Sequence, residues 1–71
     1  MREYTVIYER GSNNWSAYVP DLPGCVNAGA TREVAKYNTR DAIKLHLQGI
    51  REDGLDIPEP ICVAGKLEVA A

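Results

Sequence analysis

The sequence predicts an α+β fold in which a small antiparallel sheet packs one face against a single long helix. Three observations lead to this prediction: strand-like alternation in the first third of the chain, a long amphipathic segment after it, and a second alternating segment near the end. Their order is β-β-β-α-β. A chain of 71 residues has room for one domain, which we expect to span residues 1–71.

The first two expected strands form an N-terminal hairpin. The first runs from Glu3 to Arg10 and is rich in β-branched and aromatic residues. Residues 11–14 are Gly-Ser-Asn-Asn, which favour a tight turn. The second strand runs from about Trp15 to Val19. Alternation places three aromatic or aliphatic side chains on one side of the first strand, namely Tyr4, Val6 and Tyr8.

A turn bracketed by two prolines separates the hairpin from the third strand. Pro20 and Pro23 lack an N–H and fix φ near −65°, so the segment Pro20 to Gly24 cannot continue a strand ladder. The third strand is expected from Cys25 to Ala28. We interpret this segment mainly as a rigid turn that redirects the chain, but its position at an edge also makes Asp21 and Leu22 candidate partner contacts.

The long helix is expected from Arg32 to Asp53. Thr31 stands at the N-cap position and Gly54 is the C-terminal stop. At 100° per residue, the stripe expected to face the sheet consists of Ala35, Asn38, Thr39, Ala42, Ile43, His46, Gly49 and Ile50. The opposite, solvated row consists of Lys36, Arg40, Lys44, Gln48 and Arg51. Leu45 lies on the shoulder between them and is a further candidate partner contact.

The last expected strand runs from Ile61 to Ala70, after the connection that contains Pro58 and Pro60. Apolar residues alternate there at positions 61, 63, 67 and 69, with Gly65 between them. One helix covers only one face of a sheet, so the other face is left for water or for a partner. Trp15 and Tyr18 are the aromatic residues expected to contribute to such an interface.

Charge and cysteine content narrow the classes of function. The formal net charge is −2, so no basic field attracts nucleic acid, and a basic partner protein suits the surface better. Cys25 and Cys62 form no Cys-x-x-Cys pair, and both are interpreted as buried hydrophobes in a cytoplasmic protein. No apolar run is long enough to span a membrane.

No constellation typical of catalysis is present, so we expect no enzyme, cofactor or metal. The only histidine, His46, falls on the sheet-facing stripe and is interpreted as a packed, hydrogen-bonded residue. The four acidic candidates for a magnesium site are dispersed over a turn and along the helix; they are Asp21, Glu33, Asp41 and Asp53. Neither a nucleophile elbow nor a phosphate-binding glycine spacing occurs.

Several segments in fixed order resemble the HicB family of antitoxin domains. The segments are Y-V-P-D-L-P-G-C at Tyr18 to Cys25, G-A-T-R-E-V-A at Gly29 to Ala35, N-T-R-D-A-I at Asn38 to Ile43 and G-L-D-I-P-E-P at Gly54 to Pro60. Each piece alone has little specificity, but their order and spacing together are specific, and the similarity covers most of the chain.

The resemblance implies a partial ribonuclease H-like β-β-β-α-β fold and an inhibitory role. Members of this family bind small basic HicA mRNA interferases and block their RNA-cutting site. Full-length members usually carry a C-terminal DNA-binding segment, whereas this sequence stops at Ala71. We therefore expect a toxin-binding antitoxin without direct DNA binding.

Two other functions remain open from the sequence. One is an orphan homo-oligomeric regulator or scaffold without a toxin, and the other is a degenerate nuclease fold with weak metal-dependent activity. A domain of this size has a small core, so burial against a second copy would stabilise it. We expect a homodimer, or a tetramer, in each case.

Overall fold

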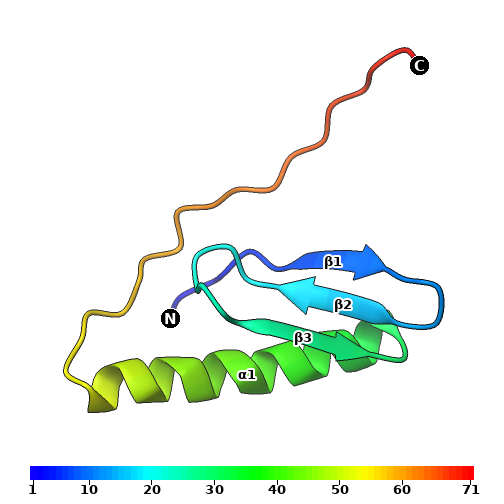
Figure 1. The fold of residues 1–71 in the computed structure, drawn as a ribbon. Helices are drawn as coiled ribbons and strands as arrows, with labels where there is room; N and C mark the ends of the chain where they lie inside the picture. Colours follow the sequence, from blue (N-terminus) through cyan, green and yellow to red (C-terminus); the bar gives the residue numbers. More distant parts are fainter.

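The computed structural model describes residues 1–71 and shows a three-stranded antiparallel sheet packed against one long helix (Figure 1). The strands lie in the order β1-β2-β3. The elements are β1 (Ile7–Arg10), β2 (Trp15–Tyr18), β3 (Val26–Gly29) and α1 (Arg32–Glu52). The α+β fold predicted from the sequence is confirmed, with the helix on one face of the sheet.

The core lies between the inner face of the sheet, the proline turn and the middle of the helix. Val19, Leu22 and Cys25 are its three buried members. Partly buried side chains from the N-terminal segment and the helix pack around them, namely Tyr4, Val6, Ala42, Ile43 and Leu47. Tyr4 and Val6, which were predicted to lie on one side of the first strand, both pack against the core, but that strand begins at Ile7 and the residues before it form no ladder with β2.

The proline turn folds back on itself and places Leu22 in the core. The amide of Leu22 donates to the carbonyl of Val19 at 3.0 Å, and the amide of Cys25 donates to the carbonyl of Leu22 at 3.0 Å. The amide of Val19 also donates to the carbonyl of Cys25 at 3.1 Å. Gly24 has φ of +85°, a conformation that other residues rarely adopt. This closed loop leaves the Leu22 side chain 0% exposed.

Helix α1 begins and ends close to the predicted residues. The amide of Val34 donates to Oγ1 of Thr31 at 3.1 Å, which confirms Thr31 as the N-cap. The helix ends at Glu52, one residue before the predicted limit, and Gly54 follows with φ of +71°. On the sheet-facing stripe, Ala35 and Thr39 are fully buried, as the periodicity predicted.

Replacing Thr31 with alanine is expected to destabilise the fold by about 1 kcal/mol, because one amide of the first helical turn loses its acceptor. Urea unfolding followed by circular dichroism measures the change. Ser12→Ala, in the exposed hairpin loop, is the matched control and should leave the midpoint unchanged. Equal midpoints for the Thr31→Ala variant and the wild type would contradict the capping role.

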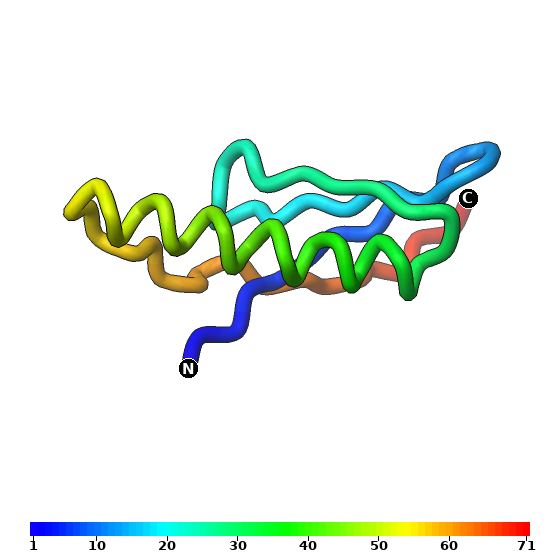
Figure 2. The backbone as a smooth tube through the Cα atoms, turned by 90° about the horizontal axis from the view of Figure 1, so that it is seen from below, coloured from blue at the N-terminus to red at the C-terminus, as the bar shows by residue number.

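The strand predicted from Ile61 to Ala70 is not formed. The chain after the helix forms no further helix or strand, and no hydrogen bond between two backbone groups involves residues 56–71. An apolar alternation shows that a segment fits a sheet, but a strand also requires a neighbouring edge to pair with. Figure 2 shows this segment returning along the molecule without joining the sheet.

Side chains of the N-terminal segment hold the first part of this C-terminal stretch. Arg2 forms a salt bridge with Glu59 at 3.1 Å, and Oγ1 of Thr5 donates to the carbonyl of Cys62 at 2.8 Å. The Tyr4 hydroxyl donates to the carbonyl of Pro58. Beyond Cys62 no hydrogen bond is formed. We call residues 63–71 the arm, and Figure 1 shows it leading away from the sheet.

Candidate functional site

The face of the sheet that the helix does not cover carries one apolar row across all three strands. Tyr18 pairs with Ile7 of β1 on one side and with Val26 of β3 on the other. Because paired residues project to the same face, these three side chains lie next to one another. Tyr18 is 39% exposed and Val26 is 65% exposed. We call Ile7, Tyr18 and Val26 the outer row.

Trp15 does not belong to the outer row, although we predicted it together with Tyr18. The two residues are three positions apart in the same strand, so their side chains project to opposite faces. Trp15 is half-buried and pairs with Arg10 and Gly29 at the end of the sheet near the hairpin loop. The structure therefore divides the predicted aromatic pair between two surfaces.

Leu22 and Asp21, the two candidates from the proline turn, have different surroundings. Leu22 is in the core and presents no surface to a partner, so we do not include it in the interface proposed below. Asp21 accepts a hydrogen bond at Oδ2 from the amide of Cys62 at 3.1 Å. The turn residue predicted to contact a partner thus contacts the chain's own C-terminal stretch.

Asp21 and Cys62 shift each other's protonation equilibria. The side-chain hydrogen bond with Cys62 lowers the pKa of the Asp21 carboxyl, and the same hydrogen bond raises the pKa of the Cys62 thiol. The pKa of the Asp21 carboxyl is lower in the folded chain than its ordinary value. The stabilisation that this contact gives is therefore fully present above the ordinary carboxyl pKa, and it is lost as the pH falls through the lowered pKa.

Cys62 is exposed, which corrects the prediction that both cysteines are buried; only Cys25 is buried.

Replacing Asp21 with asparagine is expected to speed alkylation of Cys62 at mildly alkaline pH, because a lower thiol pKa gives more thiolate. Iodoacetamide labelling followed by mass spectrometry measures the rate. Asp41→Asn on the helix surface is the control, and an unchanged rate in the Asp21→Asn variant would contradict the contact.

Leu45 lies on an exposed apolar stripe of the helix. It is 70% exposed, and it does not pack against the core as Leu47 does. Val34 and Tyr37 are also exposed, and their spacing places them on the same side of α1 as Leu45. We call these three residues the helix stripe. The structure thus shows two separate apolar surfaces, one on the sheet and one on the helix.

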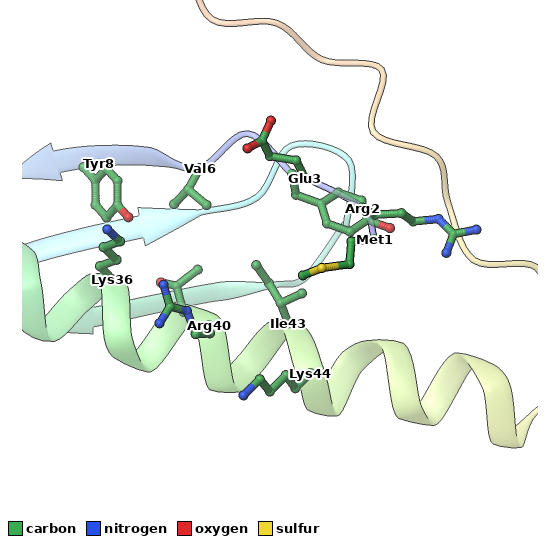
Figure 3. Close-up of a pocket in the computed structure, with 11 residues that line it drawn as sticks. Met1, Arg2, Glu3, Val6, Tyr8, Lys36, Arg40, Ile43 and Lys44 are labelled. Carbon is green, nitrogen blue, oxygen red and sulfur yellow. The ribbon is translucent and has the colours of Figure 1, made fainter.

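A groove of about 680 Å³ lies between the helix and the N-terminal segment that leads into β1. Helix α1 packs mainly on β3 and β2, so the inner side of β1 is only partly covered. Figure 3 shows Val6 and Tyr8 from the strand side and Lys36, Arg40 and Lys44 from the helix side. These three cations belong to the row predicted to be solvated; they line the groove and form no salt bridge.

The remaining titratable residues do not form a cluster that could hold a metal ion. No three histidine, cysteine or acidic side chains lie in positions to hold a metal ion. His46 is half-buried and makes no hydrogen bond, so the prediction of a hydrogen-bonded core histidine was wrong. No helix in the structure is both long enough and apolar enough to cross a membrane.

Comparison with known proteins identifies relatives of this chain. Residues 4–69 match a family described as the HicB-like antitoxin of bacterial toxin–antitoxin systems. An uncharacterised protein of Haemophilus phage HP1 is 36% identical over 79% of this chain and 42% of its own length. Antitoxin HicB 2 of Photorhabdus laumondii is 33% identical over 80% of this chain and 41% of its own length. The chain therefore spans less than half of these two relatives.

A solved structure shows the same architecture. A chain in the HicA3 and HicB3 toxin–antitoxin complex superposes with a TM-score of 0.68 and 26% sequence identity. The superposition covers 80% of this chain and 66% of the other. The family match extends over nearly the whole sequence and agrees with the observed fold. This chain belongs to the HicB-like antitoxin family.

Proposed function

We propose that this chain is the antitoxin of a type II toxin–antitoxin pair, and that it binds a small basic HicA-type mRNA interferase and occludes its RNA-cutting site. The observation that carries the proposal is the likeness to a chain in a HicA3 and HicB3 complex, in both fold and sequence. Inhibition then needs no catalytic group, since a bound protein surface excludes the RNA. The action is steric, without cofactor or metal.

The outer row is the surface we assign to the toxin. It is apolar, it crosses all three strands, and both Tyr18 and Val26 are exposed on it. Aromatic residues in apolar patches of this kind are common anchors of protein interfaces. The net charge of −2 suits a basic partner and would speed the encounter between the two proteins.

An orphan regulator that assembles with itself is the second candidate function. The observation that favours it is the number of large apolar side chains left exposed on the sheet, the helix and the arm of so small a chain. In either function we expect a homo-oligomer, a dimer or a tetramer, in the cytoplasm. The degenerate nuclease has no supporting cluster of carboxylates and is not proposed.

Co-purification with the product of the neighbouring gene tests the antitoxin function. The two proteins are co-expressed, one of them tagged, and the complex is then added to an RNA-cleavage assay beside the free toxin. A stable complex in which cleavage is abolished supports the proposal. A neighbouring nuclease that neither binds the chain nor is inhibited by it would overturn the proposal and leave the orphan regulator.

A further inference from the structure

Strand β3 forms the open edge of the sheet. The opposite edge, β1, is flanked by the chain's own C-terminal stretch, because Arg2 and Thr5 just before this strand bond to Glu59 and Cys62. Figure 1 shows that stretch on the side of β1 that is away from β3. Strand β3 pairs only with β2. An edge strand with unpaired backbone groups is a place where another strand can be added.

The hydrogen-bond pattern of β2 and β3 shows which backbone groups face this edge. The amide of Val19 donates to the carbonyl of Cys25 at 3.1 Å, so these two residues are a hydrogen-bonded pair of the antiparallel ladder. Such pairs alternate with pairs that exchange no hydrogen bond, so Val26 and Ala28 direct their N–H and C=O groups away from β2. The side-chain amide of Asn38 donates to the Ala28 carbonyl at 2.9 Å, which agrees with this direction.

Two of these four backbone groups have no partner within the chain. The Ala28 carbonyl accepts from Asn38, and the Val26 amide donates to the Gly24 carbonyl at 3.1 Å. The Val26 carbonyl and the Ala28 amide remain, one acceptor and one donor. When two β3 strands pair antiparallel with Asn27 opposite itself, the Ala28 amide of each copy lies opposite the Val26 carbonyl of the other. This register satisfies both free groups in both copies.

The side of helix α1 next to β3 is self-complementary in the same arrangement. The helix packs mainly on β3 and runs in the opposite direction (Figure 1). Because Asn38 bonds to the strand residue that follows Asn27, the two-fold axis is level with about position 40 of the helix, since one strand residue spans about two helical residues. The exposed residues Val34 and Leu45 share the side of the helix that carries Asn38, at nearly equal distances from this level. Val34 of one copy is therefore placed opposite Leu45 of the other.

The polar residues between these two apolar positions also match. Asn38 uses one of its two side-chain amide hydrogens on the Ala28 carbonyl and has a second one to donate. Asp41 lies on the same side of the helix and forms no salt bridge within the chain. The two-fold axis brings Asp41 of one copy opposite Asn38 of the other, so the second amide hydrogen gains a carboxylate acceptor.

We propose that two copies of this chain form a dimer through their β3 edges, antiparallel about a two-fold axis at Asn27, with Val34 of each helix against Leu45 of the other. The two sheets then form one sheet of six strands, with both helices on the same face. The contact covers the free backbone groups of β3 and two exposed apolar side chains of each copy, and a domain with so small a core is stabilised by this burial. Both outer rows lie on the opposite face and stay open, so the inference does not depend on a toxin.

Cysteine cross-linking at position 27 tests the strand register. Residues opposite each other in a pair without hydrogen bonds are about 4.5 Å apart between their Cα atoms, which is within the range of a disulfide. In a Cys62→Ala background, with buried Cys25 retained, Asn27→Cys should give a covalent dimer on a non-reducing gel after mild oxidation. Ser12→Cys, in the exposed hairpin loop, is the control and should stay monomeric on the same gel. If Asn27→Cys gave no more covalent dimer than Ser12→Cys, the proposal would be overturned.

Light scattering on helix variants provides a second, independent test. The wild-type chain should have twice the 7.8 kDa mass of one copy, and Leu45→Asp should have the mass of one copy, because its charge would be buried against Val34 of the other copy. Leu55→Asp is the matched control, since Leu55 is an equally apolar exposed residue outside the contact, and it should remain dimeric. Helical circular dichroism confirms that each variant is folded. A wild-type monomer, or a folded Leu45→Asp variant that keeps the mass of the dimer, would contradict the proposed contact.

Discussion

Replacing Leu22 with alanine is expected to destabilise the protein by about 2–5 kcal/mol, the range measured for large-to-small changes at buried leucines. Leu22 is fully buried, and it is the largest side chain among the three buried members of the core. A domain of this length has a total stability of only roughly 3–5 kcal/mol. A large fraction of the Leu22→Ala chains should therefore be unfolded at room temperature.

Urea unfolding followed by Trp15 fluorescence and by helical circular dichroism measures this effect. The matched control is Leu55→Ala, since Leu55 is an exposed leucine just after the helix. The control should unfold at the wild-type midpoint. If the Leu22→Ala variant unfolded at the wild-type midpoint, the proline turn would not contribute to the core as described.

The elements of the fold that depend on local chemistry were predictable from the sequence. Thr31 caps the helix because its hydroxyl lies within reach of the Val34 amide, and this follows from sequence position alone. Gly54 ends the helix because a positive φ is easily adopted only by glycine. The hairpin loop was predicted on the same basis, from Gly-Ser-Asn-Asn at residues 11–14.

The features that depend on contacts between distant segments were not predictable. Leu22 was assigned to an exposed turn because two prolines flank it, but the backbone hydrogen bonds of that turn direct its side chain inward. The segment from Ile61 has a strand pattern, and whether it pairs depends on an edge elsewhere. Cys62 is exposed for the same reason, because the strand predicted to bury it does not form.

The candidate site was predicted in part. Tyr18 was identified from its aromatic character, but its neighbours Ile7 and Val26 become apparent only once the strand register is known. Leu45 was identified from its helical phase. Val34 and Tyr37 lie on the same side, and the same phase calculation could have found them had it been applied to the exposed surface as well as to the sheet-facing stripe.

Replacing Tyr18 with aspartate is expected to weaken binding to the proposed toxin by about 2 kcal/mol or more, roughly thirtyfold in Kd, as for anchor residues of other interfaces. Tyr18 is the centre of the outer row, between Ile7 and Val26. When the toxin binds this row, the aspartate would be buried between these apolar side chains and the partner surface, and burying an unpaired charge costs free energy. Isothermal titration calorimetry measures the affinity, and RNA cleavage measures the loss of inhibition.

Two further variants separate the sheet from the helix as the binding surface. Ser12→Asp adds the same charge in the exposed hairpin loop and should leave the affinity unchanged. Leu45→Asp places the same charge on the helix stripe, which lies on another part of the molecule, and this variant should bind the toxin with the wild-type affinity. If Leu45→Asp abolished binding while Tyr18→Asp did not, the toxin would occupy the helix stripe.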